Sequence, residues 1–157
     1  MITGSILANT FLERAFDEEI EISPMKLQKI LYFTCLEYLR FTETLLFTEP
    51  FEAWRYGPVL PSAYAEFSSY GKNGITRFAR DSQGKVFLVN ESANPQLKEA
   101  INRVWEGCKR LTAIELSQLT HREGTGWDRA TKKKELVITM EDMQREIIDG
   151  PKESWQY

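Results

Sequence analysis

The stretch "SPMKLQKILYFTCLEYLRF", residues 23–41, decides the fold. Ser23 is a good helix N-cap, and Pro24 suits the first helical position because the N–H that it lacks has no partner there. The helix should run to about Leu39 or Phe41. Apolar side chains cover most of its circumference, which predicts a helix buried at the centre of the protein. The apolar residues are Leu27, Ile30, Leu31, Phe33, Cys35, Leu36, Tyr38 and Leu39.

Further helices are expected on both sides of this central one. Their signals are apolar residues at helical spacing, proline at the first helical position, and capping residues such as Thr112 with Glu115. A short helix around Trp127 and an irregular path are both compatible with residues 123–134. The expected helices cover residues 5–16, 61–70, 95–108, 113–122 and 140–149.

Two β-hairpins are expected between the helices. The first pairs "LLF", residues 45–47, with "FEAWRY", residues 51–56, and Gly57-Pro58 ends it. The second covers residues 75–89, with Asp81–Gly84 as its turn. The predicted fold class is therefore α+β and helix-dominated, with five to six helices around one central apolar helix and one or two small β-hairpins.

The length of 157 residues favours one domain, residues 1–157, with residues 150–157 as a loose tail. No apolar run approaches the roughly 20 residues of a membrane span. The N-terminal segment lacks a positively charged region and a cleavage site, so we expect a cytoplasmic protein without a signal peptide. Cys35 and Cys108 lie in apolar helical patterns and are expected to be buried free thiols.

The residue types needed for the common catalytic and metal sites are missing or poorly placed. One histidine and two distant cysteines do not make a zinc site, and no phosphate-binding glycine loop is present. His121 is the only histidine available as a base, and a hydrogen bond at a helix end is favoured over a catalytic role for it. We therefore expect no enzyme activity, no cofactor and no metal.

Charge is uneven along the chain although the net charge is only −3. Residues 71–134 hold 13 Lys and Arg against 7 Asp and Glu. With a helix and a hairpin expected in residues 61–89, this segment is similar to part of a winged helix, so nucleic-acid binding is the alternative function. The candidate basic residues are Arg77, Arg80, Lys85, Arg122, Arg129, Lys132, Lys133 and Lys134.

Three motifs in order resemble the Panacea domain family of SocA-like antitoxins. They are "ISPMKLQKILYF", "FEAWRYGPVLPSAY" and "LSQLTHREGTGW", and together they span about residues 23–130. The sequence departs from the family pattern at Gly126, where many members have a proline before the tryptophan. The matching residues are Ser23, Pro24, Lys26, Leu27, Gln28, Lys29, Leu31, Tyr32, Ala53, Trp54, Tyr56, Gly57, Pro58, Val59, Pro61, Tyr64, Leu116, Ser117, Thr120, His121 and Trp127.

The resemblance implies an interaction protein that neutralises a cognate toxin by direct protein–protein contact. At least one member acts as an adaptor that presents a toxin to an ATP-dependent protease, so such a protease is a second expected partner. Trp54 and Tyr56 are compatible with a partner surface and also with a buried strand face, because both lie on one side of the strand. The candidate partner-binding residues are Trp54, Arg55, Tyr56, Pro58, His121 and Trp127.

Overall fold

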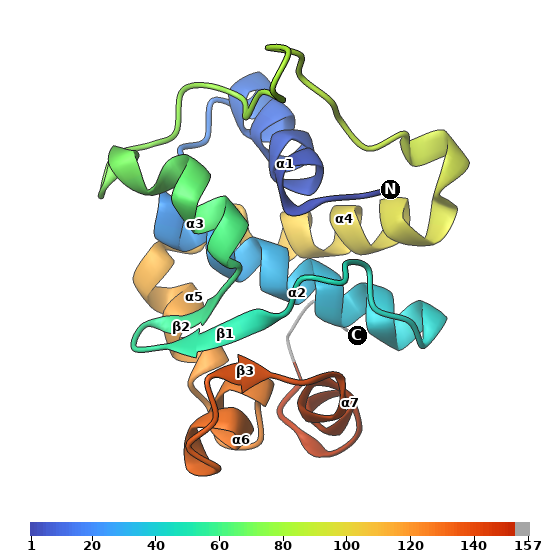
Figure 1. Ribbon diagram of the computed structural model, residues 1–157, viewed down its shortest axis with the longest axis vertical. Coiled ribbons are helices and arrows are strands. Elements are labelled where there is room, and N and C mark those ends of the chain that lie inside the picture. The colour runs from blue at the N-terminus through green and yellow to red at the C-terminus, as the bar shows by residue number, and fades with distance from the viewer. Residues whose placement is uncertain (153–157) are drawn as a thin grey trace.

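The computed structural model describes residues 1–152, which form seven α-helices and a three-stranded antiparallel sheet (Figure 1). This confirms the helix-dominated α+β class. Short 3₁₀ turns follow α3 and precede α4, at Ser68–Tyr70 and Glu91–Ala93. The elements are α1 (Gly4–Glu18), α2 (Pro24–Thr42), β1 (Phe51–Trp54), β2 (Gly57–Val59), α3 (Pro61–Phe67), α4 (Pro95–Cys108), α5 (Ala113–Thr120), α6 (Gly126–Lys132), β3 (Val137–Ile138) and α7 (Met140–Asp149).

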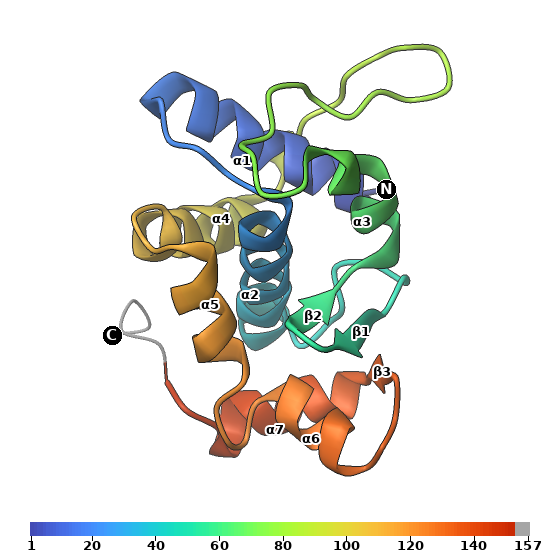
Figure 2. The ribbon, with the colours of Figure 1, turned by 90° about the vertical axis from the view of Figure 1, so that its left-hand side faces the viewer.

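Helix α2 lies at the centre of the protein, as its apolar circumference predicts (Figure 2). The Ser23 hydroxyl accepts a hydrogen bond from the Lys26 amide at 3.3 Å, which confirms the predicted N-cap. Helices α1, α3, α4, α5 and α7 and strand β2 all contact α2. Every residue from 26 to 37 is buried, including the polar ones, so each polar side chain on α2 must find its partner inside the protein.

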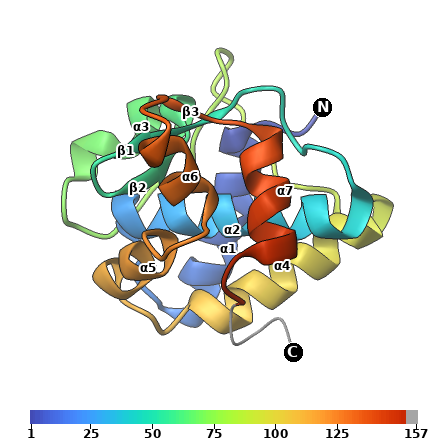
Figure 3. The same ribbon diagram turned by 90° about the horizontal axis from the view of Figure 1, so that it is seen from below.

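The side chain of Tyr32 joins α2 to the two helices near the C-terminus. Seen from below, α7 crosses α2 with α6 beside it (Figure 3). The Tyr32 hydroxyl donates to Glu146 Oε1 at 2.7 Å, and the Gly126 amide donates to the same oxygen at 2.8 Å. Burial raises the pKa of both the Glu146 carboxyl and the Tyr32 hydroxyl. One buried carboxyl therefore fixes α6 and α7 against the central helix.

The first hairpin forms, but not between the predicted segments. Strand β1 pairs with β2, and a two-residue turn of Arg55 and Tyr56 joins them, while residues 45–47 form no strand. Ala53 lies opposite Pro58, and the Ala53 amide donates to the Leu136 carbonyl at 2.7 Å on the other side of β1. The missing N–H of Pro58 therefore costs no hydrogen bond in this hairpin, so the proline does not end it.

Strand β3, Val137–Ile138, was not predicted from the sequence. It pairs with β1 on the edge away from β2, with Phe51 opposite Ile138, and completes the sheet in the order β2-β1-β3. Two residues are too few to show an alternating pattern, so this strand had no periodic signal.

The predicted hairpin in residues 75–89 is wrong. The segment loops over α1 at the top of Figure 1 without forming a strand, apart from a local turn in which the Asp81 amide donates to the Lys85 carbonyl at 2.8 Å. Its backbone groups pair with α1 instead. The buried Asn9 amide group bonds both the N–H and the C=O of Ala79, at 2.8 and 2.9 Å, and the Thr10 hydroxyl accepts from the Val89 amide at 2.9 Å.

The remaining expectations about helices and thiols agree with the structure. Capping boxes begin α5 and α7 at Thr112 and Thr139, and residues 126–132 form a helix around Trp127. Cys35 and Cys108 are buried thiols, and neither is part of a disulfide. Among residues 1–152, no helix is both long and apolar enough to cross a membrane. The predicted tail, residues 150–157, lies mostly outside the described residues, which end at 152.

The buried charge of Glu146 predicts a pH dependence of stability. Because burial raises its pKa above the ordinary 4.5, the folded protein holds this proton more tightly than the unfolded chain does. Protonation therefore favours folding, and this advantage is lost as the pH rises from about 4.5 through the raised pKa. Urea unfolding at several pH values should show wild type losing stability with rising pH relative to Glu146→Gln, which has no ionisable group at this position.

Glu146→Ala serves as the contrasting variant. It removes the acceptor and leaves the Tyr32 hydroxyl and the Gly126 amide unpaired, so the free energy of unfolding should fall by about 2–4 kcal/mol. A difference between wild type and Glu146→Gln that stays constant with pH would contradict the assigned direction of the pKa.

Candidate functional site

The turn between β1 and β2 is held by side chains that come from far along the chain. The carbonyl oxygens of Trp54, Arg55 and Tyr56 are three successive acceptors at this turn. Each faces one side chain from the segment that contains α5 and α6. Side chains of the motif "LSQLTHREGTGW" therefore bond the backbone of the motif "FEAWRYGPVLPSAY". The three groups, in the order of the carbonyls, are Trp127 Nε1 at 2.6 Å, His121 Nε2 at 3.0 Å and Ser117 Oγ at 2.7 Å.

The first motif holds the strand that follows the turn. The Gln28 amide donates to the Leu60 carbonyl at 3.3 Å and accepts from the Leu60 amide at 2.7 Å, much as a neighbouring strand would. The Lys29 ammonium donates to the Pro58 carbonyl at 3.4 Å. Side chains of α2 therefore substitute for a strand partner at the outer edge of β2. All three motifs thus meet at one hairpin.

Two side chains at the tip of the hairpin are exposed. Tyr56 is 57% exposed, and Arg55 is exposed beside it with its guanidinium carbon 5.5 Å from the Tyr56 ring centre. Trp54 is half-buried, its indole N–H donates to Glu52 at 2.7 Å, and its ring packs edge-on against Tyr64 at 4.8 Å. For Tyr56, the structure therefore excludes the alternative of a buried strand face.

The other three candidate residues lie beneath this tip. Pro58 is buried, whereas His121 and Trp127 are half-buried with their ring centres 4.0 Å apart. His121 caps the C-terminal end of α5, and its Nδ1 lies 2.5 Å from the Ser117 carbonyl. This confirms the predicted hydrogen bond at a helix end. Backbone carbonyls therefore hold the ring at both of its nitrogens, Nδ1 and Nε2.

A groove of about 440 Å³ opens beside the hairpin, between the start of α2, β2 and α3. Trp54, Tyr56 and Tyr64 form much of its aromatic wall, and Lys29 lies against it. Lys29 is only 1% exposed, and desolvation lowers the pKa of its ammonium to about 8. A buried ammonium beside an aromatic groove is the most unusual electrostatic feature of this surface.

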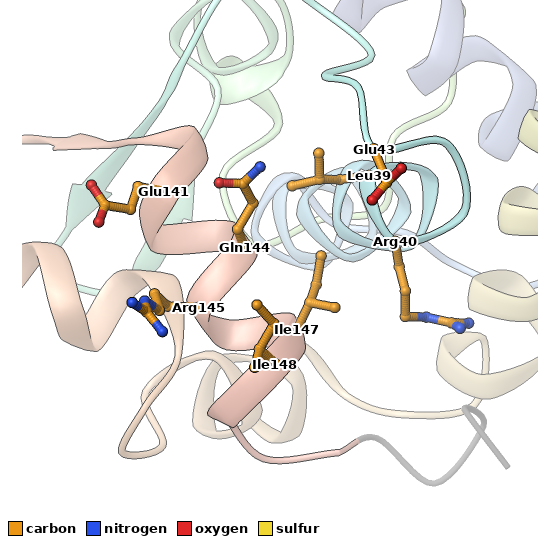
Figure 4. Close-up of a pocket in the computed structure, with 8 residues that line it drawn as sticks. All are labelled: Leu39, Arg40, Glu43, Glu141, Gln144, Arg145, Ile147 and Ile148. Carbon is orange, nitrogen blue, oxygen red and sulfur yellow. The ribbon is translucent and has the colours of Figure 1, made fainter.

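A second hollow, of about 670 Å³, lies between the end of α2 and α7 (Figure 4). Its apolar residues include Leu39 and Ile147, and its charged side chains carry both signs. Arg40 points away from α7 and pairs with Glu37 at 2.5 Å, while Arg145 pairs with Asp149 at 3.4 Å. Both arginines of this hollow are therefore paired with a carboxylate on their own helix, unlike Lys29.

The candidate basic residues do not gather into one patch. The segment that carries Arg77, Arg80 and Lys85 lies at the top of Figure 1, and α6 lies at the opposite end of the long axis. Near α6, the Lys132 ammonium pairs with Asp128 at 2.9 Å and the Lys133 ammonium pairs with Asp142 at 2.6 Å. Without a hairpin in residues 75–89, the likeness to a winged helix has no structural counterpart.

The sequence singled out the hairpin but missed the residues that hold it. Gln28, Lys29 and Ser117 were noted only as matches to the motifs, and none was assigned a role at the turn. Their helical spacing gave no sign of it, because a hydrogen bond across more than 25 positions depends on how the helices pack. Within residues 1–152, no group of three or more His, Cys, Asp or Glu side chains is arranged to hold a metal ion.

Comparisons with known proteins agree with the three motifs. The sequence profile described as "Antitoxin SocA-like, Panacea domain" matches residues 27–128. The chain is also 34% identical over 130 residues to the protein named Antitoxin SocA of Caulobacter vibrioides (strain NA1000 / CB15N). That alignment covers 81% of this chain and 69% of the relative. No solved structure matches the chain.

The crowded position of Gly57 predicts that the hairpin tolerates no side chain there. Gly57 has a φ of +119°, and a Cβ at this position would lie 2.7 Å from Thr120 Oγ1 and 2.8 Å from Lys29 Cε. Gly57→Ala should lower the free energy of unfolding by about 2–5 kcal/mol, since it combines backbone strain with overpacking. Chemical denaturation measures this change.

Gly84→Ala is the matched control. Gly84 also has a positive φ, of +80°, but no atom lies within 4 Å of its added Cβ. The free energy of unfolding of this variant should fall only by the backbone strain, about 1–2 kcal/mol. Equal losses in the two variants would show that the contacts of Gly57 with α2 and α5 contribute nothing.

Proposed function

Because the chain belongs to the family of SocA-like antitoxins with a Panacea domain, we propose that it neutralises a cognate toxin by binding it directly. We place the toxin-binding surface at the hairpin tip because Arg55 and Tyr56 are exposed there. Three side chains fix three successive backbone carbonyls of this turn. A fixed turn loses little conformational entropy when a partner binds to it.

The six candidate residues divide into two roles in this proposal. Trp54, Arg55 and Tyr56 contact the toxin, and they belong to the residue types that dominate binding energies at protein interfaces. The other three position the turn from beneath, and they act on binding through the backbone that they hold. These positioning residues are Pro58, His121 and Trp127.

The fate of the bound toxin forms a second part of the proposal. The chain acts in the cytoplasm as an adaptor that presents the toxin to an ATP-dependent protease, as its resemblance to the family implies. In that case the toxin's half-life in cells shortens when this protein is present and recovers when the protease is deleted. An unchanged half-life of the toxin would overturn the adaptor role, and the protein would then neutralise the toxin by binding alone.

Co-expression tests the antitoxin function itself. The candidate toxin is the product of the gene adjacent to the one that encodes this chain, since members of the family are encoded beside toxins. We expect that product to arrest growth alone, and we expect this chain to restore growth and to co-purify with it. Arrest that persists together with the absence of a complex would overturn the proposal.

Replacing both exposed residues at the tip should weaken the complex without unfolding the protein. In Arg55→Ala/Tyr56→Ala the three backbone carbonyls of the turn remain, so the free energy of unfolding should change by less than about 1 kcal/mol. Loss of an Arg and a Tyr from the centre of an interface should raise the Kd for the toxin at least about tenfold. Calorimetric titration measures this Kd.

A matched control uses the other hollow. Arg145 and Ile148 on α7 also form an exposed pair of one arginine and one large apolar residue. Arg145→Ala/Ile148→Ala should leave the Kd unchanged. If the Kd rises more in the α7 variant than in the hairpin-tip variant, the toxin binds near α7 and the proposed surface is wrong.

A further inference from the structure

The groove beside the hairpin carries positive charge and no negative charge. Its charged lining residues are Lys29 and Arg55, and no Asp or Glu lines it. The rest of the lining is aromatic, aliphatic or neutral polar, and it includes the edge-on pair of Trp54 and Tyr64. At about 440 Å³ it lies near the lower end of ligand-sized pockets, so it accepts one or two side chains rather than a whole helix.

Lys29 is the unusual group in this lining. Its side chain is buried, yet its ammonium donates to one carbonyl, that of Pro58, at the long distance of 3.4 Å. An ammonium has three donors, and burying one without a carboxylate is costly. Desolvation accordingly lowers its pKa, to about 8. The folded protein therefore holds a cation whose electrostatic partner is missing from the described residues.

Another buried lysine on the same helix reaches its carbonyl partner at a much shorter distance. Lys26 donates to the Lys109 carbonyl at 2.6 Å, at the end of α4 and away from the groove. Lys26 thus closes a helix end at short range, whereas Lys29 reaches its carbonyl only loosely. This difference on one helix indicates that Lys29 retains capacity for a further acceptor.

We propose that this groove receives a segment of the toxin in which an acidic side chain lies next to an aromatic or aliphatic one. This inference rests on the proposed antitoxin function and names the chemistry of its partner. The carboxylate pairs with Lys29, and the neighbouring apolar side chain packs on Trp54 and Tyr64. Arg55 at the rim adds a second positive charge toward the same acidic segment.

Lys29→Met tests the charge directly, because it keeps a long side chain in place and removes the ammonium. The variant should remain folded with an unchanged or higher melting temperature, since a poorly paired buried charge is lost. Its Kd for the toxin should rise by about 30-fold or more, the effect of removing one partner of a buried ion pair. Lys26→Met is the matched control, and its Kd measured well below its melting temperature should equal that of wild type.

A photo-crosslinking amino acid at position 64 tests the identity of the occupant. Position 64 lines the groove, and position 148 on α7 serves as the control site. Mass spectrometry of the product should find the toxin joined at position 64 through a segment that contains Asp or Glu next to an apolar residue. No product is expected from position 148.

The outcomes separate this inference from the proposed function. If wild type binds the toxin and Lys29→Met binds it equally well, the inference is wrong and the antitoxin function stands. A crosslinked segment without an acidic residue would also overturn it. If wild type neither binds nor neutralises the toxin, the proposed function fails, and this inference fails with it.

Discussion

The structure depends on one constraint, which is that α2 is buried on every side. Over twelve consecutive residues, 26 to 37, no side chain reaches solvent freely, yet several of them are polar. The longest of these polar side chains are therefore matched by groups on surrounding elements. Gln28 serves the backbone at Leu60, and Tyr32 meets Glu146. Burial of α2 thus dictates how the sheet and the C-terminal helices pack around it.

The hairpin of β1 and β2 is bonded both by polar side chains of α2 and by side chains from the segment that contains α5 and α6. A sheet this small has little stability of its own, and its two outer strands are very short. Gln28 and Lys29 take the place of a missing strand beside β2, and Trp127, His121 and Ser117 bond the three carbonyls at the turn. Residues of all three family motifs therefore hold the same turn in place, and this turn exposes Arg55 and Tyr56.

The two segments in which the structure differs from the sequence-based prediction share a physical cause. Residues 75–89 alternate like a hairpin, but Asn9 and Thr10 on α1 satisfy their backbone groups, and no pattern within the segment reveals that competition. The glycine and proline at 57–58 resemble a stop signal, but the proline sits where the ladder needs no N–H. In both cases residues distant in sequence determine how the backbone of the segment is hydrogen-bonded, and a local sequence pattern does not contain that information.

By itself, the sequence determined most of the helices, the caps at Ser23, Thr112 and Thr139, the central place of α2 and the family, because propensity, periodicity and motif spacing are local properties of the chain. It also marked the hairpin as the segment to examine. Only the tertiary structure decided which residues of that hairpin face outward, which histidine and tryptophan contacts hold it, and that Lys29 lies buried with a single loose partner. These features depend on distances between residues 29 to 73 positions apart, and such distances are fixed by the packing of whole helices rather than by any local pattern.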